Sequence, residues 1–195
     1  MQAIHWNYFF AIEDDLATLS RYIEFHPDNF ATYSIENARI LMAAVQEIDV
    51  LLKAICGHYG APAANVHDYY KLLADKHPNI RIANVTLSHH ALVRTPFANW
   101  TESIPPLWWT GNNKVKHARD TEFKMASLEN VIDAASAMLI VNVYHQAIVG
   151  EKDFTLSREP RFFDLKWFWH CVGGHSSAAY QKIFGINHRK QQLGS

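Results

Sequence analysis

The chain has 195 residues, of which 49% are hydrophobic and 19% are charged, and its formal net charge at pH 7 is −1. This composition is typical of a globular protein and excludes an intrinsically disordered chain. A net charge so close to zero also excludes a basic surface all round, so any contact with phosphate groups must use a local cluster of cations. The length fits one domain, which we expect to span residues 1–195, with a helical core at about 12–150 and a C-terminal extension at 151–195.

Cysteine usage and the apolar stretches bear on the compartment. Cys56 and Cys171 are the only cysteines and stand far apart in the sequence, so we expect reduced thiols and no disulfide framework. The first residues lack the basic stretch and long apolar core of a secretory signal. The longest apolar stretch is 131–149, and polar side chains interrupt it at Asp133, Asn142, His145 and Gln146. A membrane span rarely places so many polar groups in lipid. We therefore expect a soluble, cytoplasmic protein with no membrane contact.

In chain order, the first two expected helices lie before residue 60. A short amphipathic helix is expected at about 12–25, ending before Pro27. The segment "SIENARILMAAVQEIDVLLKAICGHYG" follows, with Ser34 as its expected N-cap and Gly57 or Gly60 as its stop. Apolar residues recur in it at alternating spacings of three and four, at Ala38, Leu41, Val45, Ile48, Leu52 and Ile55. This spacing predicts one buried face of a long helix. Asp49 and Lys53 fall mainly away from that face and stand four residues apart, in the favourable orientation for an ion pair.

The second half predicts two more long helices separated by irregular chain. A shorter helix is expected at about 65–74, and the apolar residues of 80–87 indicate extended chain with an irregularity. The proline-rich stretch 93–106 is expected to be turn-rich, with helix resuming after Pro106. A last helix is expected at 122–149, apolar over most of its circumference and therefore central to a bundle or buried in a dimer.

Beyond Gly150 the chain is expected to be extended, and the aromatic segment "KWFWHCVGG" is expected to pack against one end of the core as a short helix or strand. The fold class that these elements predict is mainly α, an up-and-down helical bundle with a small β or extended element.

The segment "WWTGNNKVKHARDTEF", residues 108–123, concentrates an imidazole and several cations. On a helix, Asn113 and His117 share a face, and Asp120 three residues further on is placed to hold one imidazole nitrogen. Groups suited to phosphate or RNA lie beside them, namely Asn112, Lys114, Lys116 and Arg119. A histidine moves protons near neutral pH while cations stabilise a phosphate, so the segment predicts a site for an anionic substrate. The alternative is a solvated polar face on a helical bundle.

Metal and cofactor motifs are missing from the sequence. The chain has 12 histidines, including the pair His89 and His90 and the two of "HCVGGH", but none has a second pair of ligands at zinc-finger spacing, and there is no HExxH. The sequence also lacks GxGxxG, GxxxxGK[ST] and GxSxG. We therefore expect neither a metal nor an organic cofactor.

Four segments, taken in order and spacing, resemble one branch of the prokaryotic HEPN superfamily: "SIENARILMAAVQEIDVLLKAIC", "PFANW", "PPLWWTGNNKVKHARDTEF" and "MASLENVIDAASAML". The resemblance covers roughly residues 30–150. HEPN domains are compact helical bundles, usually dimeric, and many are metal-independent ribonucleases of toxin–antitoxin and phage-defence systems. The resemblance therefore implies a homodimer that acts on RNA, with an antitoxin or a nucleotidyltransferase as a candidate partner.

The HEPN signature is an arginine followed four to six residues later by a histidine, and the two meet across the dimer. By this resemblance His117 matches the histidine, and Asn113 matches the polar residue that often follows the arginine. The arginine's own position falls on Asn112 or nearby, and no arginine lies between Arg94 and His117. An asparagine donates a hydrogen bond but carries no charge. Either Lys114, Lys116 or Arg119 supplies that charge, or the site binds RNA without cutting it.

Three functions remain open from the sequence. The first is a HEPN-like RNA-binding protein or metal-independent endoribonuclease, with His117 as the catalytic group and Asn113 and Lys116 as its helpers. The second is a noncatalytic HEPN-like module for dimerisation or interaction. The third is a nucleotide pocket lined by Trp100, Trp108 and Trp109. In the homodimer, we expect apolar faces of the long helices to be buried and the segment 114–119 to lie near the interface.

Overall fold

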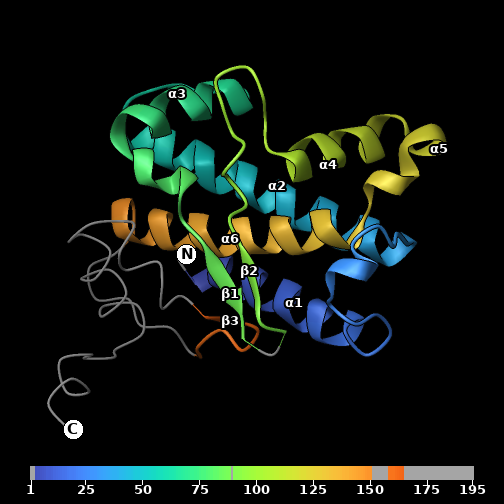
Figure 1. The fold of residues 1–195 in the computed structure, drawn as a ribbon. Coiled ribbons are helices and arrows are strands. Elements are labelled where there is room, and N and C mark those ends of the chain that lie inside the picture. The colour runs from blue at the N-terminus through green and yellow to red at the C-terminus, as the bar shows by residue number, and fades with distance from the viewer. Residues whose placement is uncertain (1–2, 89, 151–157, 165–195) are drawn as a thin grey trace, which may run out of the picture.

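The computed structural model describes residues 3–88, 90–150 and 158–164, which form a mainly α-helical fold with a small antiparallel sheet (Figure 1). The α-helices are α1 (Ala3–Leu19), α2 (Ile35–His58), α3 (Val66–Lys76), α4 (Leu107–His117), α5 (Arg119–Glu122) and α6 (Leu128–Ile148). Short 3₁₀ turns are η1 (Pro27–Asn29), η2 (Pro78–Arg81) and η3 (Phe123–Met125). The strands are β1 (Val85–Leu87), β2 (Leu92–Arg94) and β3 (Phe163–Asp164). The predicted fold class is therefore confirmed.

The centre of the fold is α6, which packs along α2 and also contacts α1 and α4. Figure 1 shows α6 crossing the middle of the molecule, with α1 on one side and α3 and α4 on the other. By length and composition α6 is apolar enough to cross a membrane, but 83% of its most apolar window is buried inside the protein, as in the core helix of a soluble protein. One chain thus covers α6, so its apolar circumference gives no reason to expect a dimer through this helix.

The long helix predicted from residue 34 onward is confirmed as α2. Its N-cap is Ser34, whose hydroxyl oxygen accepts a hydrogen bond from the Asn37 N–H at 3.0 Å. The six residues of the predicted apolar stripe are all buried. The helix ends at His58, and Gly60 follows with a φ of 66°, a left-handed conformation that glycine adopts without strain. Of the two predicted stops, Gly60 is therefore the one that ends the helix, and Gly57 lies inside it.

Two other helices differ from their predicted bounds. The first was expected at 12–25, but α1 already begins at Ala3 and ends at Leu19, because Trp6, Phe9 and Phe10 are buried in the core and extend the apolar face toward the N-terminus. The last was expected to begin at 122, but α6 begins at Leu128 after the N-cap Ser127. Residues 119–125 form α5 and η3 instead.

The sheet has the strand order β2-β1-β3, with Leu87 of β1 opposite Leu92 of β2 and Phe163 of β3. The buried carboxylate of Glu13 in α1 accepts hydrogen bonds from the N–H groups of residues 161 and 162, at 2.6 and 2.9 Å, and so holds the segment before β3 against the bundle. Part of the chain expected to be extended after Gly150 is thus a strand. The segment 166–174, with Cys171, lies outside the described residues, as does His89.

Candidate functional site

One face of α4 anchors the predicted motif to the core. Pro106 precedes the helix, as predicted, and Trp108 and Val115 are buried. The indole Nε1 of Trp108 donates a hydrogen bond to the carbonyl oxygen of Pro96 at 2.9 Å, which satisfies its only donor. The opposite face carries the polar residues of the motif to the surface, where Asn113, Lys114, Lys116 and His117 are exposed.

The helix ends within the motif, at His117. Its C-cap, Ala118, has φ −142° and ψ 45°, which is not a helical conformation, and α5 starts afresh at Arg119. Asp120 therefore does not continue the helical face of Asn113 and His117, contrary to the expectation from a single helix. Within the described part of the chain, no hydrogen bond or ion pair joins Asp120 to His117, so the expected orienting carboxylate is not in place.

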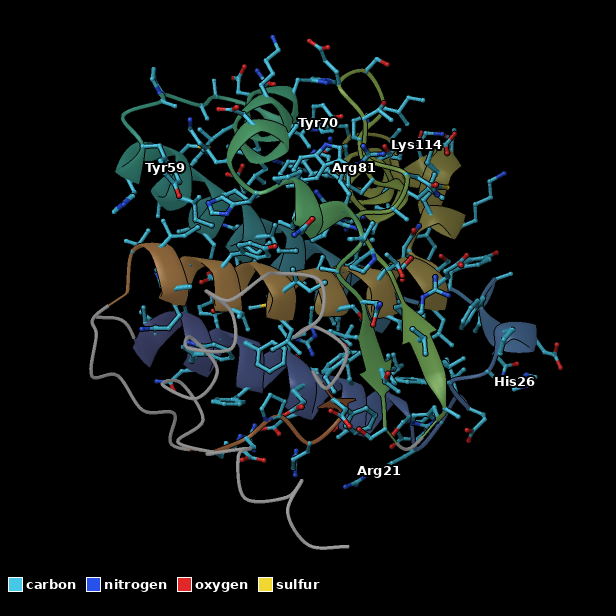
Figure 2. The ribbon with its side chains drawn as sticks, turned by 60° about the vertical axis from the view of Figure 1, so that its left-hand side comes forward. Arg21, His26, Tyr59, Tyr70, Arg81 and Lys114 are labelled. Carbon is cyan, nitrogen blue, oxygen red and sulfur yellow. The ribbon has the colours of Figure 1, made fainter. Side chains whose placement is uncertain are left out.

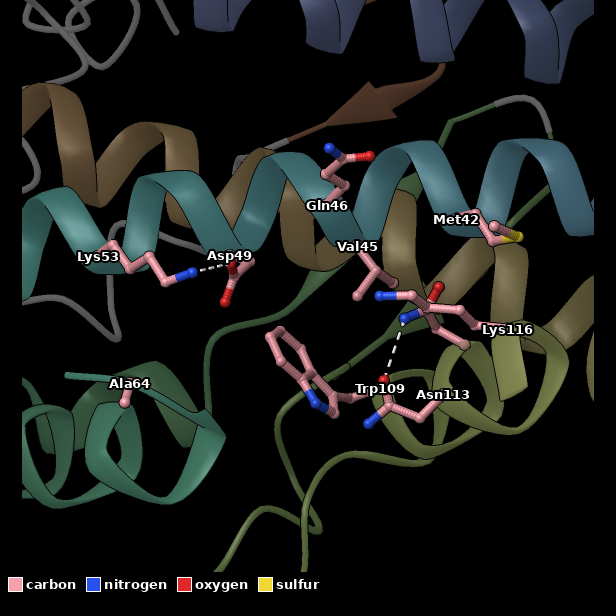
Figure 3. A pocket seen from close by; sticks show the side chains of 10 residues that line it. Met42, Val45, Gln46, Asp49, Lys53, Ala64, Trp109, Asn113 and Lys116 are labelled. Carbon is pink, nitrogen blue, oxygen red and sulfur yellow. Dashed lines mark hydrogen bonds and ion pairs between the residues drawn. The ribbon is translucent and has the colours of Figure 1, made fainter. Parts of the chain in front are cut away.

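A hollow of about 420 Å³ lies between α2 and α4 (Figure 3). Its lining comes from α2, from the loop before α3 and from α4, and consists of Met42, Val45, Gln46, Asp49, Lys53, Ala64, Trp109, Asn112, Asn113 and Lys116. Three residues of the predicted site, Asn112, Asn113 and Lys116, thus meet side chains of α2 that are distant in sequence. Asn112 and Asn113 also contact each other, with Nδ2 of Asn112 donating to Oδ1 of Asn113 at 3.4 Å.

The single carboxylate of the hollow is fully engaged. The hydroxyl of Tyr69 donates to Oδ1 of Asp49 at 2.6 Å, and Nζ of Lys53 donates to Oδ2 at 2.5 Å, which confirms the predicted Asp49–Lys53 pair. Burial of Tyr69, reinforced by the hydrogen bond to Asp49, raises the pKa of the Tyr69 hydroxyl, which therefore stays a donor. Lys116 has no hydrogen bond or ion pair to another described residue, so it is the cation of the hollow that is free to meet a ligand.

A second, wider groove of about 810 Å³ lies on the other side of Met42, which lines both. Its other lining residues are Ile35, Ala38, Arg39, Arg119, Asp120 and Phe123. Arg39 is paired with Asp15 and Glu36 at 2.8 and 2.6 Å. Arg119 donates only to the Val115 carbonyl oxygen and to the Met42 sulfur, both at 3.4 Å, so among the described residues no carboxylate neutralises it.

The structure divides the six predicted site residues into three groups. Asn112, Asn113 and Lys116 line the hollow, and Arg119 lines the groove. Lys114 is outside both and pairs with Glu122 at 3.3 Å. Figure 2 shows Lys114 at the surface, on the far side of α6 from Arg21. His117 is exposed at the end of α4, between Lys116 of the hollow and Arg119 of the groove in sequence, and lines neither.

Sequence reasoning missed the contribution of α2 to the site. Gln46, Asp49 and Lys53 follow one another at spacings of three and four, which places them on one helical face away from the buried stripe. That polar stripe was the available signal. Of the three tryptophans expected to line a nucleotide pocket, Trp109 alone lines the hollow, because Trp100 and Trp108 are each 1% exposed and pack against Phe97 in the core.

Comparison with protein-family models, with curated proteins and with solved structures finds no match to this chain. Among the described residues, no group of three or more histidine, cysteine, aspartate or glutamate side chains is arranged to hold a metal ion. His90, for example, contacts Glu24 at 3.1 Å and packs against Phe25 and Phe162.

Proposed function

We propose that this protein binds RNA through the C-terminal half of α4 and cleaves it without a metal ion, with His117 as the proton-transfer group. The observation that carries the proposal is the position of Lys116 and His117. Both are exposed at the end of α4, and neither has a hydrogen bond or ion pair to another described residue. Lys116 lines the hollow and His117 is the next residue in the sequence, and an imidazole together with an ammonium group is suited to a ribose-phosphate backbone.

The reaction that fits these groups is internal transesterification. The ribose 2′-oxygen attacks the adjacent phosphorus, the new 2′-O–P bond forms, and the P–O5′ bond breaks. His117 takes the proton of the 2′-hydroxyl, and the resulting imidazolium gives that proton to the departing 5′-oxygen, so the products are a 2′,3′-cyclic phosphate and a 5′-hydroxyl, and His117 is neutral again. Negative charge gathers on the phosphoryl oxygens in the transition state. A cation beside these oxygens therefore stabilises the transition state more than the ground state, which lowers the barrier.

Two cations near His117 replace the arginine that the HEPN resemblance would require. Lys116 precedes His117 and lines the hollow, whereas Arg119 follows it and lines the groove. Met42 belongs to both depressions, so they are neighbours on the surface of α2. An RNA strand lying across Met42 would therefore pass from the hollow with Lys116 to the groove with Arg119, two cations that no described carboxylate pairs with.

The test is cleavage of single-stranded RNA by wild type and by His117→Ala, in the presence of a chelator. Loss of a general acid–base group lowers the rate by about 10²- to 10⁴-fold, and the melting temperature should not change because His117 is exposed. His58→Ala is a matched control, since His58 is also exposed and also the last residue of its helix. The catalytic proposal fails if wild type binds RNA but leaves it intact, or if His117→Ala cleaves as fast as wild type.

A noncatalytic dimerisation module is the second candidate, and the groove favours it. Ile35 at its rim is 81% exposed, beside Met42 and Phe123, so an apolar patch lies open next to α5. Arg119 and Asp120 lie on the same groove, and a two-fold axis there would pair each with the opposite charge of a second copy. The result that would support this candidate is a stable dimer in solution that neither binds nor cuts RNA. The resemblance to HEPN proteins would place either function in a bacterial defence or toxin–antitoxin system.

A further inference from the structure

We propose that the hollow between α2 and α4 receives one unpaired nucleobase of the bound RNA, next to the phosphate held at Lys116. The inference rests on the proposed RNA binding and adds the part of the substrate that the hollow selects. Figure 3 shows the side chains that carry it, with Val45 and Asp49 on the side of α2 toward Trp109, Asn113 and Lys116 of α4. Gln46 of α2 also belongs to the lining.

The size and apolar part of the hollow suit a planar ring. A volume of about 420 Å³ falls in the range of roughly 300–1,000 Å³ that small-molecule pockets have, and would hold a base with its sugar. Met42 and Val45 supply an apolar wall from α2, and the Trp109 indole lines the hollow from α4. Proteins usually hold single-stranded RNA by stacking aromatic side chains on bases that are splayed out of the strand.

The polar part of the lining consists of amides. Gln46, Asn112 and Asn113 each carry a carbonyl oxygen and an NH₂ group, so the hollow offers both acceptors and donors. Gln46 is exposed and makes no hydrogen bond within the described chain. Asn113 accepts from Asn112, which leaves its NH₂ group for a ligand. Amides match the donor–acceptor edge of adenine in particular, so adenine is the expected preference.

The charges argue for a neutral ring attached to a phosphate. Asp49 is already satisfied by Tyr69 and Lys53, so it does not demand a cationic ligand. With one carboxylate and two lysines in the lining, the hollow carries one net positive charge, and that charge is on the unpaired Lys116. A purely apolar ligand would leave the amides without partners, which costs free energy. A base with its flanking phosphate satisfies both the amides and the lysine.

The experiment measures the affinity of labelled 2′-O-methyl pentanucleotides that differ only at the central position, which is adenine, uracil or an abasic sugar. Stacking is worth about 1–3 kcal/mol per base, so the abasic strand should bind wild type roughly 10-fold more weakly than the adenine strand. Gln46→Ala should reduce the preference for adenine over uracil. Ala64→Trp, at the exposed rim, should fill the hollow and bring the adenine strand to the affinity of the abasic one.

Asn7→Ala is the matched control, because Asn7 is an exposed amide on a helix that lies on the other side of α6. Equal affinity of all three strands for wild type overturns the base site but leaves RNA binding standing. If no strand binds, the proposed function fails, and titration with adenosine monophosphate then decides about the hollow. If adenosine monophosphate binds saturably to wild type but not to Ala64→Trp, the hollow is a base site even without RNA. If adenosine monophosphate does not bind to wild type, the base site is overturned as well.

Discussion

Gly111 of α4 lies directly against Asn130 of α6, so closely that a Cβ atom at Gly111 would stand 2.7 Å from Nδ2 of Asn130. The same Nδ2 donates a hydrogen bond to the Met125 carbonyl oxygen at 2.9 Å, and that oxygen would lie 3.2 Å from the added Cβ. The glycine of the motif therefore lets α4 approach α6, and this approach sets where the exposed face of α4 stands relative to α2.

We predict that Gly111→Ala destabilises the protein by about 1 kcal/mol. Overpacking costs about 1–3 kcal/mol, whereas alanine in place of glycine favours a helix by about 1 kcal/mol. Gly57→Ala in α2 is the control, since no atom lies within 4 Å of its added Cβ, and it should be stabilising. Chemical denaturation measures both. In an Asn130→Ala background, Gly111→Ala should lose its penalty, and an unchanged penalty there would contradict the assigned contact.

Arg94 should be the most important ion-pair residue for stability in the described chain. Its guanidinium donates to both carboxylate oxygens of Asp133, at 2.6 and 2.9 Å, and to Glu129 at 2.9 Å, fastening β2 to α6. Burial raises the pKa of Asp133 in spite of Arg94, so an unpaired charge there is costly. Arg94→Met should reduce the free energy of unfolding by about 3 kcal/mol, as measured with urea at pH 7.

The control for Arg94 is an exposed pair. Nζ of Lys71 lies 3.9 Å from Glu102, with both side chains mostly exposed, and Lys71→Met should change stability little. Equal losses in the two variants would show that the Arg94 network contributes no more than a surface ion pair.

His145 should make the protein less stable in mild acid. It is 7% exposed, and burial together with the neighbouring His5 lowers the pKa of His145 from 6.5 to about 4. The unfolded chain takes up this proton below its ordinary pKa of 6.5, whereas the folded protein stays neutral at His145 down to about pH 4. The contribution of His145 to stability is therefore lost as pH falls from 6.5 to about 4, and this contribution changes no further below that.

The loss due to His145 should amount to about 3 kcal/mol over that interval. The measurement is the free energy of unfolding in urea, for wild type and for His145→Gln, at a series of pH values. Subtracting one from the other removes the contributions of groups that titrate in both proteins, such as Glu13 and Asp133. A difference that is constant between pH 6.5 and pH 4 would contradict the buried neutral imidazole.

Lys116→Ala should weaken RNA binding and flatten its salt dependence. Loss of one phosphate contact on a single strand lowers the slope of log affinity against log salt by about 0.7. Lys76→Ala is the control, because Lys76 is exposed in the last turn of α3 and outside the hollow. A substrate with 2′-deoxyribose at the scissile position should bind but resist cutting, for lack of the nucleophile. An unchanged salt slope in Lys116→Ala would remove this lysine from the proposed RNA contact.

Ile35→Glu should convert a wild-type dimer into a monomer. The patch of Ile35, Met42 and Phe123 lines the same groove as Arg119, which belongs to the segment 114–119 where the interface was predicted. Tyr22→Glu is a control of equal exposure, since Tyr22 is 82% exposed and Ile35 81%. Sedimentation at micromolar concentration distinguishes the two states. A wild-type monomer, or a dimer that Ile35→Glu leaves intact, would contradict the proposed interface.

Local patterns in the sequence were sufficient for much of the fold. The alternating spacing of apolar residues in 38–55 identified the buried face of α2, Ser34 marked its start, and the stop was narrowed to Gly57 or Gly60, of which the structure shows Gly60. Periodicity and capping depend on residues within a few positions of one another, so they can be predicted locally. The same is true of the Asp49–Lys53 pair and of helix starting after Pro106. The helix period also separates the exposed Asn113 and His117, which were predicted to share a face, from the buried Trp108 and Val115.

Only the tertiary structure decided which of these polar residues share a site. The hollow exists because α2 and α4, which are distant in sequence, both pack on α6, with Gly111 of α4 against Asn130. No local sequence pattern encodes how closely α4 approaches α6. The non-helical backbone of Ala118 removed Asp120 from the face of His117, although the spacing had placed it there. Burial of α6 by the rest of the chain likewise depends on long-range packing. Spacing along one helix determines a face, but the neighbour of that face is set by the contacts that fill the core.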